Sequence, residues 1–337
     1  MINKQLLYLL CIVLSVSSCK YNKHVDVYKI GTSYETPVLT SNYSQCMKSD
    51  GEGLCYLSNR DNTFILTYLD LDFKNPATFE IPVGKGPGEI QVSGGVSICN
   101  DKFYILDLIS RKMEVYDKDG SHIDTFYINI TDNILSFDLF DENRIVIKTE
   151  NTKDLILYDL VEKKILKSVK QNQLGSVYCN DGNIYHITIS LPFVFSHFDK
   201  ELSRINEKKI KTDKNISDLK LLNNNGRSIL IGDFLGYSAY FDDSNIYTPT
   251  VSKRIYIENS SSVRKPYQPE IVILNKKLKV NRYVHIQGVN RINGYVTVVF
   301  GSNSDIILHV IDYGGDIAKY FNKDHFKGFL HITVSGQ

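Results

Sequence analysis

Two short turn signals recur along this chain at a nearly constant spacing, and this repeat limits the possible folds more than any other feature. The first signal is a turn pair, found at Asp50-Gly51, Asn100-Asp101, Asp141-Glu142, Asp181-Gly182, Asn225-Gly226 and Asn293-Gly294. The second is an apolar residue followed by Asp, and its acidic residues are Asp70, Asp117, Asp159, Asp199, Asp242 and Asp312. Asn and Asp favour turns because their side chains hydrogen-bond to the nearby backbone. Two independent signals therefore indicate the same repeating unit.

The length of the unit indicates its architecture. Successive residues of the second signal are 40 to 47 positions apart, except for a gap of 70 before Asp312. Within one unit, 103–107 and 113–116 are β-rich runs of strand length. About 42 residues with four short strands is the size of a β-propeller blade. We predict an all-β fold over residues 26–337, a six-bladed β-propeller of four-stranded antiparallel blades. A β-sandwich is the alternative, although sandwiches do not normally keep such a period.

The gap of 70 residues predicts an insertion after blade 5, at about 243–284. Long loops on a regular scaffold often carry binding residues, and Tyr and Arg are enriched at binding hot spots. The partner-binding residues expected in this segment are Tyr247, Arg254, Tyr256, Arg264 and Tyr267. The alternative is an extra hairpin that covers the edge of a blade. The chain ends with another β-rich run at 329–334, which we expect to pair near 26–30 and so close the ring; the alternative is that the chain is truncated within this blade.

The N-terminal segment has the pattern of a secretory signal, which is set aside before fold reasoning. Lys4 precedes an apolar run at 6–16, which is too short to span a bilayer. Ser17 and Ser18 then precede Cys19, as in the lipobox of bacterial lipoproteins. We predict a signal peptide at 1–18, a lipidated Cys19 and a tether at 19–25; an ordinary signal peptide with a chance Cys is the alternative. The residues after Cys19 are basic before they are acidic, which predicts an exported protein anchored in the outer membrane and facing the periplasm.

Local motifs for chemistry are weak. Gly84, Gly86, Pro87 and Gly88 form a glycine-rich segment between two predicted strands, but a phosphate-binding P-loop needs a different spacing and a following helix. We interpret these residues as a structural turn. The eight histidines show no metal-binding spacing, there is no Gly-x-Ser-x-Gly elbow, and neither a metal nor another cofactor is predicted. With 39 basic and 38 acidic side chains, the charge balance predicts no nucleic-acid binding.

Three features together resemble a known group of proteins: the lipobox, the repeated units and the Gly-x-Gly-Pro-Gly-Glu segment at 84–89. Further local likeness lies at 294–301 and 310–315. The chain resembles the TolB-like or NHL-like six-bladed β-propeller lipoproteins of Bacteroidota-type bacteria. The resemblance implies a fold and an envelope location but no reaction. The expected function is a lipid-anchored, non-catalytic binding or scaffold module for an envelope protein or glycan. The alternative is a propeller-type hydrolase, lactonase or lyase with its site at the central channel.

Overall fold

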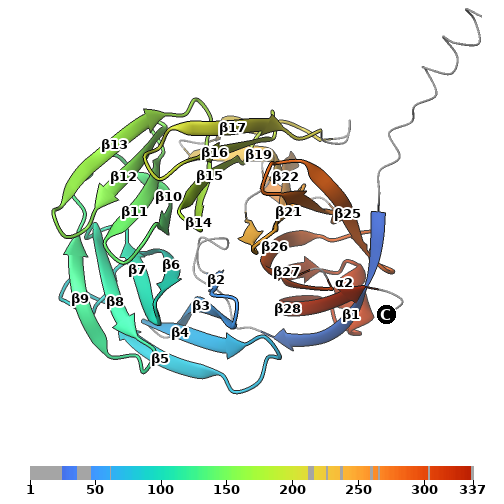
Figure 1. Cartoon of the computed structure of the whole chain (residues 1–337). Coiled ribbons are helices and arrows are strands. Elements are labelled where there is room, and N and C mark those ends of the chain that lie inside the picture. Colours follow the sequence, from blue (N-terminus) through green and yellow to red (C-terminus); the bar gives the residue numbers. More distant parts are fainter. Residues whose placement is uncertain are drawn as a thin grey trace, which may run out of the picture.

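The structure is a computed structural model, and it describes residues 25–35, 47–60, 62–211, 216–224, 227–235, 238–258, 261–264, 266–302 and 304–334. Within these ranges the regular secondary structure is β-strand, apart from one short helix, α2 (Asp316–Tyr320). The sheets stand around a central channel like the blades of a propeller (Figure 1). The predicted all-β propeller of four-stranded antiparallel blades is therefore confirmed in its general architecture.

Four sheets are regular antiparallel blades in which the strand order follows the chain. Blade 1 consists of β2 (Met47–Ser49), β3 (Gly53–Arg60), β4 (Thr63–Asp70) and β5 (Ala77–Pro82). Blade 2 consists of β6 (Ser93–Cys99), β7 (Lys102–Asp107), β8 (Lys112–Asp117) and β9 (His122–Tyr127). Blade 3 consists of β10 (Ile134–Leu139), β11 (Arg144–Thr149), β12 (Asp154–Asp159) and β13 (Lys164–Lys170). Blade 4 consists of β14 (Gly175–Asn180), β15 (Asn183–Thr188), β16 (Val194–Phe198) and β17 (Arg204–Lys209).

Neighbouring blades are held together by apolar side chains in the seams between them. Leu57 of β3 and Ile105 of β7, for example, are fully buried in one cluster between blades 1 and 2. Strand residues alternate between the two faces of a sheet, so each middle strand contributes to two seams. The outermost strand β13 is mostly exposed, because no further blade covers it. Burial in the seams is the main source of stability for such a fold.

The turn signals mark the ends of strands in these four blades, as predicted. Asp117 follows the third strand of blade 2, and its carboxylate accepts hydrogen bonds from the backbone N–H groups of Asp119 and Ser121 at 3.0 and 2.8 Å. Asp199 binds the backbone of Glu201 and Ser203 in the same way at the matching turn of blade 4. The repeated Asp is therefore a turn former in these blades.

The remaining strands form one 12-stranded sheet, called the large sheet below. Its strand order is β18-β19-β22-β26-β27-β28-β1-β25-β24-β21-β20, and β23 pairs with β22. In chain order after β1, its first six strands are β18 (Lys220–Asn224), β19 (Arg227–Phe234), β20 (Tyr240–Phe241), β21 (Asn245–Pro249), β22 (Lys253–Glu258) and β23 (Ser261–Arg264). The others are β24 (Ile271–Asn275), β25 (Val280–Ile286), β26 (Gly294–Gly301), β27 (Asp305–Tyr313), β28 (His325–Val334) and β1 (Val25–Glu35).

The two ends of the chain meet in the large sheet. β1 pairs antiparallel with β28, with Ile30 opposite Ile332, and it also pairs in parallel with β25, with Val27 opposite His285. The expected pairing of 329–334 with the start of the chain is therefore confirmed. Because β1 is hydrogen-bonded along both edges, it fuses strands that would otherwise belong to separate blades.

The expected number of blades is wrong. Within the described ranges the structure has five sheets, four regular blades and the large sheet, in place of six separate blades. The two last landmarks explain the error. Asp242 lies in the turn after the innermost strand β20, where its carboxylate binds the backbone of Ser244 and Asn245. Asp312 lies inside β27, is fully buried, and accepts hydrogen bonds from Asn293 and from the start of α2. Neither position is equivalent to the earlier turns.

Residues 243–284 are also not one insertion. β21, β24 and β25 pair in sequence as regular antiparallel members of the large sheet. Only β22 and β23 form an extra hairpin, and β22 pairs with β19 of a second hairpin, β18-β19. The additional length is therefore divided between two hairpins, one before β20 and one after β21.

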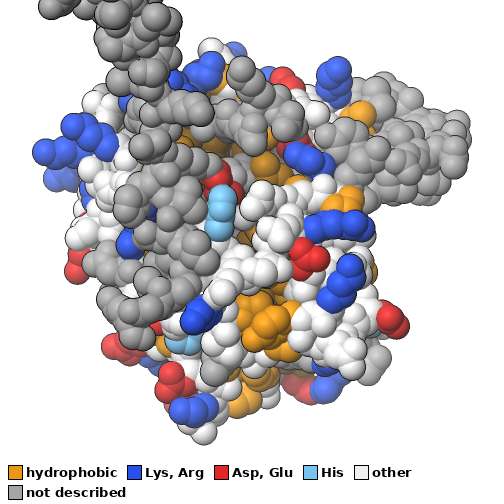
Figure 2. Space-filling view, turned by 90° about the vertical axis from the view of Figure 1, so that its right-hand side faces the viewer, with side chains coloured by type: hydrophobic (Ala, Val, Ile, Leu, Met, Phe, Trp, Pro, Cys, Tyr) orange, Lys and Arg blue, Asp and Glu red, His pale blue; other side chains and the backbone are white. Residues whose placement is uncertain are grey.

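On the side of the molecule that carries the large sheet, basic and acidic side chains are interspersed (Figure 2). This view agrees with the near balance of 39 basic and 38 acidic residues. In the ranges described above, no helix is both long enough and apolar enough to cross a membrane.

Candidate functional site

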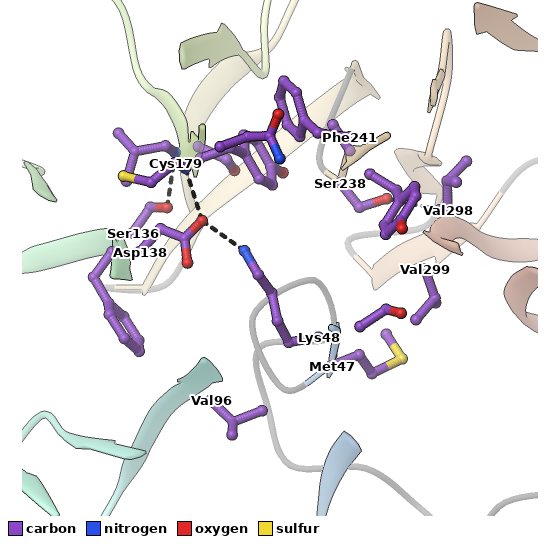
Figure 3. Close-up of a pocket in the computed structure, with 18 residues that line it drawn as sticks. Met47, Lys48, Val96, Ser136, Asp138, Cys179, Ser238, Phe241, Val298 and Val299 are labelled. Carbon is purple, nitrogen blue, oxygen red and sulfur yellow. Dashed lines mark hydrogen bonds and ion pairs between the residues drawn. The ribbon is translucent and has the colours of Figure 1, made fainter. Parts of the chain in front are cut away.

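A cavity of about 100 Å³ lies in the central channel, where the innermost strands converge (Figure 3). Blades 1 to 4 contribute β2, β6, β10 and β14 to its wall, and the large sheet contributes β20 and β26. The polar side chains that line it are Lys48, Ser49, Ser136, Asp138, Ser176, Cys179, Asn180, Ser238 and Tyr240, with Tyr178 and Phe241 among the aromatic ones. Six segments far apart in the sequence thus meet at one site.

Asp138 is the central charged residue of this cavity, and its side chain is 4% exposed. One carboxylate oxygen accepts hydrogen bonds from Lys48 Nζ at 2.5 Å and from the backbone N–H of Cys179 at 2.9 Å. The other accepts from Ser97 Oγ at 2.8 Å and from the backbone N–H of Leu139 at 3.0 Å. A carboxylate has about four lone-pair sites, so Asp138 is fully engaged within the protein.

Lys48 extends from β2 across the channel towards β10 (Figure 3). Its ammonium lies between the Asp138 carboxylate and the ring of Tyr178, whose centroid is 5.9 Å from Nζ. The Lys48 side chain is 28% exposed, so this cation faces the cavity while it remains paired. An ammonium has three donors, and Lys48 can therefore also bind an acceptor that enters from solution.

A second group of aromatic and polar side chains surrounds the mouth of the cavity. The ring of Phe241 lies 5.5 Å from that of Tyr178, and the ammonium of Lys276 lies 5.7 Å from the Phe241 ring centroid. Lys276 Nζ also donates a hydrogen bond to Asn180 Oδ1 and lies 3.7 Å from the carboxylate of Asp181. Burial lowers the pKa of Lys276, although Asp181 opposes this shift. The mouth thus combines ring faces with hydrogen-bond donors.

Side chains of the inner strands also bind the backbone of the next strand. Ser136 Oγ accepts a hydrogen bond from the N–H of Val177 at 3.0 Å, and Ser238 Oγ accepts one from the N–H of Val298 at 2.9 Å. These contacts connect β10 to β14, and the residues just before β20 to β26. The cavity wall is therefore fixed by hydrogen bonds between blades as well as by packing, and a rigid wall reduces the entropy lost on binding.

The cavity has few groups of the kinds that act as an acid, a base or a nucleophile. Among the described residues that line the cavity, Asp138 is the one carboxylate, and histidine is absent. Burial, followed by the charge of Asp138, raises the pKa of the Cys179 thiol well above its usual value, which disfavours the nucleophilic thiolate. Across the described part of the chain, no three His, Cys, Asp or Glu side chains are grouped so that they could hold a metal ion.

Two of the predicted contact residues are core residues instead. Tyr247 of β21 is fully buried, and its hydroxyl donates a hydrogen bond to the Asp242 carboxylate at 2.7 Å. Tyr267 is 5% exposed, and its hydroxyl donates to the backbone carbonyl of Ser252 at 2.6 Å. Both rings pack inside the large sheet and present no face to a partner. The expectation that they form a contact surface is corrected accordingly.

The other three predicted contact residues lie in the extra hairpin that β22 and β23 form. Arg254 forms an ion pair with the buried carboxylate of Asp233 on β19, with Nε 2.6 Å from Oδ1. It therefore joins β22 to β19. Tyr256 and Arg264 lie on β22 and β23, where they pair with Val263 and Ile255 in the backbone ladder; their side chains are outside the described set. Cys19 also lies outside the described residues.

The glycine-rich segment connects β5 to β6, away from the channel cavity. Glu89 accepts a hydrogen bond from the backbone N–H of Gly86 at 2.7 Å, and Gly88 has a φ of +72°, a value that favours glycine. The N–H of Gly88 donates to the buried carboxylate of Glu114 at 3.0 Å. Gly84 and Pro87 complete this loop, which covers a buried ion pair at the seam between blades 1 and 2.

Sequence reasoning missed Lys48 and Asp138. Phe137-Asp138 has the same aromatic-Asp pattern as the turn landmarks, so the pattern alone does not distinguish a buried channel residue from a turn former. A charged residue inside a β-rich inner strand was the available signal. Its partner, 90 positions away, becomes a neighbour only when the ring of blades is formed.

Comparisons with known proteins agree with the fold. No family model matches this chain, and no curated protein matches it. A member of the DUF4221 family from Bacteroides vulgatus ATCC 8482 has a solved structure with a TM-score of 0.61 and 11% identity, which covers 92% of this chain and 98% of that one. The WD40 repeats of RRP9 give a TM-score of 0.50 with 8% identity, covering 90% of this chain and 97% of that one.

These likenesses lie far below the identity at which function is shared, so they show the fold alone. They support a β-propeller and do not specify the TolB-like or NHL-like type that the sequence resemblance implied. The DUF4221 structure covers nearly the whole of both chains.

Proposed function

We propose that this protein is a non-catalytic binding module of the cell envelope, and that a protein or glycan partner docks over the channel mouth and inserts one group beside Lys48. The observation that carries the proposal is the state of Asp138. Its carboxylate already accepts four hydrogen bonds from the protein, so it positions Lys48 and holds the inner strands. It has no lone pair left to take a proton from a substrate.

The size of the cavity supports a large partner with a small inserted group. Pockets for small ligands usually have volumes of about 300–1,000 Å³, whereas this cavity has about 100 Å³. It has room for one side chain or part of one sugar ring. The rest of the partner would lie on the mouth, where Phe241 and Asn180 are partly exposed. A hydrolase, lactonase or lyase site would need several converging carboxylate, Asn or His side chains, and among the described residues Asp138 and Asn180 are the only ones of these types that line this cavity.

The envelope location in this proposal depends on the sequence. Lipidation of Cys19 and a periplasmic orientation follow from the lipobox and from the basic residues after it. The Cys19→Ala variant should move from the membrane fraction to the soluble fraction, and fatty-acid labelling of the wild type should be lost. Retention of the variant in membranes, with no label in the wild type, would contradict the anchor. Protease added to intact cells should leave the protein uncut, and its digestion would contradict the orientation.

Variants at the channel mouth test the binding role. Partners captured by crosslinking in intact envelopes should be lost from Lys48→Met and Phe241→Ala proteins, each of which should still unfold in one cooperative thermal transition. Tyr127→Ala is the matched control, because Tyr127 is half exposed on the outer strand β9. If both channel variants capture the same partners as the wild type, the partner does not dock at the channel mouth.

A further inference from the structure

The seam between blades 3 and 4 has an apolar half and a polar half. Its apolar half is a buried cluster of Val146, Leu155, Leu157, Val177, Ile184, Phe198 and Leu202. In its polar half Lys148 is fully buried, and His186, Ser196 and Gln171 are at most 5% exposed. Lys148 Nζ donates hydrogen bonds to the backbone carbonyls of Lys153 and Gln171, and Arg204 donates to Gln171 Oε1 at 3.1 Å. Gln171 therefore joins the two cationic side chains.

Three buried nitrogen atoms in this half have no hydrogen-bond partner among the described residues. They are Nδ1 and Nε2 of His186 and Nε2 of Gln171. A buried polar group without a partner costs about 1–3 kcal/mol, so such groups are usually satisfied by something bound. Amide and ammonium groups are donors, and a neutral imidazole has one donor. The polar half of the seam therefore has an excess of N–H groups over acceptors.

In blade 2, the position equivalent to this polar half of the seam is occupied by a buried carboxylate. Glu114 on its third strand pairs with Thr125 on the fourth strand and with Ile105 on the second. In blade 4 the corresponding third-strand residue is Ser196, which pairs with Glu207 and His186. The register of the two blades also matches. In each blade the pairing of the third strand with the fourth strand shifts at the same distance after this position, which is Glu114 in blade 2 and Ser196 in blade 4.

The buried Glu114 carboxylate supplies the acceptors in blade 2. It forms an ion pair with Lys112 at 2.5 Å and accepts hydrogen bonds from Gly88 N–H, His122 Nε2 and Thr125 Oγ1 at 3.0, 2.8 and 2.7 Å. Blade 4 has a hydroxyl at this position. The residue opposite this hydroxyl, Glu207, has a carboxylate, but it lies on the edge strand, is 44% exposed and binds Arg204 and Ser196. The buried Lys148 thus has backbone carbonyls as partners where Lys112 has a carboxylate.

We propose that a small monovalent anion of halide size binds in the polar half of the seam between blades 3 and 4, held by Lys148, Gln171 and His186. It takes the role that the Glu114 carboxylate has in blade 2. Its small size follows from the close packing: a Cβ added to Gly175 would lie 2.3 Å from His186 Nε2, so the ring is already in contact with β14. We therefore assign an ion of halide size in preference to an oxyanion such as phosphate.

The electrostatics of the two side chains agree with this assignment. Burial, then the charges of Lys148 and Arg204, lowers the pKa of His186 to about 3. Burial also lowers the pKa of Lys148 to about 8, against the charges of Asp154 and Asp132. A bound anion offsets both effects, because it stabilises nearby positive charge. The pKa of Lys148 should therefore be higher in chloride than in gluconate.

The test compares anions at constant ionic strength with the full-length protein. Replacing sodium gluconate by sodium chloride should raise the melting temperature of the wild type along a saturable curve, while phosphate should give no such curve. A crystal soaked in sodium bromide should show an anomalous peak between Lys148 Nζ and Gln171 Nε2. A melting temperature that responds equally to all anions, or density for water only at this place, would overturn the proposal.

A transplant from blade 2 provides the sharper variant. The double substitution Ser196→Glu with Glu207→Thr recreates the Glu114–Thr125 pair in blade 4, so the protein then carries its own anion. This variant should lose the chloride dependence and should be stable in gluconate. Lys148→Met should also lose the dependence, and Lys164→Met, at an exposed position on β13, should keep it. A transplant variant that responds to chloride as the wild type does would contradict the proposal even if Lys148→Met fails to fold.

Discussion

Lys48 and Asp138 form an ion pair across the central channel, with Nζ 2.5 Å from the carboxylate, although their strands β2 and β10 are separated by β6. The same carboxylate binds Ser97 of β6 and the backbone of Cys179 in β14. One buried anion therefore connects the inner strands of all four regular blades. Lys48, whose side chain is 28% exposed, is the charged member of this network that faces the cavity.

This network predicts unequal costs for its two charged residues. Asp138→Ala leaves the Lys48 ammonium and several buried donors without their acceptor, and we expect a loss of about 3–5 kcal/mol in the free energy of unfolding. Lys48→Met removes a cation whose side chain is 28% exposed and leaves Asp138 with three other donors, so we expect a smaller loss of about 1 kcal/mol. Urea denaturation followed by circular dichroism measures both. Equal losses would show that Asp138 does not connect the strands.

His309 predicts a specific dependence of stability on pH. Both of its ring nitrogens are buried without a partner among the described residues, and burial lowers its pKa from 6.5 to about 3. The unfolded chain therefore binds a proton below pH 6.5 that the folded protein does not bind. This contribution to stability is complete above pH 6.5 and is lost as the pH falls from 6.5 towards 3, by up to about 1.4 kcal/mol per pH unit.

The His309→Leu variant should show a smaller slope of unfolding free energy against pH between 6.5 and 4. His325→Leu is the control, because His325 is exposed. Urea unfolding at pH 7, 6, 5 and 4 gives the slope for each protein. An unchanged slope for His309→Leu would mean that His309 is accessible to protons in the folded state.

The repeat was predictable because its signal is local. An Asp that binds the backbone two to four residues later makes the same turn wherever it occurs, as at Asp117 and Asp199. The signal failed where an Asp does something else. Asp242 binds the backbone in the turn after the innermost strand β20, whereas Asp117 and Asp199 lie at the turn after the third strand. Asp312 binds the backbone at the start of α2. The count of blades depended on these two residues, and so did the supposed insertion.

The candidate site was not predictable for a different reason. The cavity is made by six segments that are far apart in the chain, and their order around the channel is a property of the closed ring. The tyrosines chosen from the sequence, Tyr247 and Tyr267, have the composition of a contact surface. Their hydroxyls instead bind Asp242 and Ser252 inside the large sheet. Residue type indicated what these side chains can bind, and packing decided what they do bind.

Closure of the ring predicts that β1 is required for stability. β1 is hydrogen-bonded to β28 on one edge and to β25 on the other. A chain that begins at residue 36 exposes both of these edges, and exposed strand edges promote aggregation. We expect it to be recovered mainly in the insoluble fraction, while a chain that begins at residue 25 is soluble and keeps the melting temperature of the full-length protein. Size-exclusion chromatography with thermal unfolding compares the two. Equal solubility and melting temperature would show that β1 does not close the ring.

The buried pair Lys112 and Glu114 predicts a recoverable loss of stability. Burial alone would raise the pKa of Glu114, but hydrogen bonds from Lys112, Thr125, Gly88 and His122 hold it below its usual value. Lys112→Met removes the ion-pair partner and leaves a buried charge, which we expect to cost about 3–5 kcal/mol. Adding Glu114→Leu removes the charge as well, and an apolar pair in such a place is often no less stable than the ion pair. The double variant should therefore be more stable than Lys112→Met alone, as measured by urea unfolding at pH 7.

The same pair also predicts the behaviour in acid. Because the pKa of Glu114 is lowered in the folded state, its contribution to stability is present above the unfolded pKa of about 4.3 and is lost as the pH falls through the folded value. The double variant lacks this carboxylate, so its unfolding free energy should fall less steeply below pH 4.3 than that of the wild type. The double variant could instead be less stable than Lys112→Met and keep the wild-type dependence of unfolding free energy on pH. Such a result would show that the loop at 84–89 holds Glu114 by its backbone rather than through Lys112.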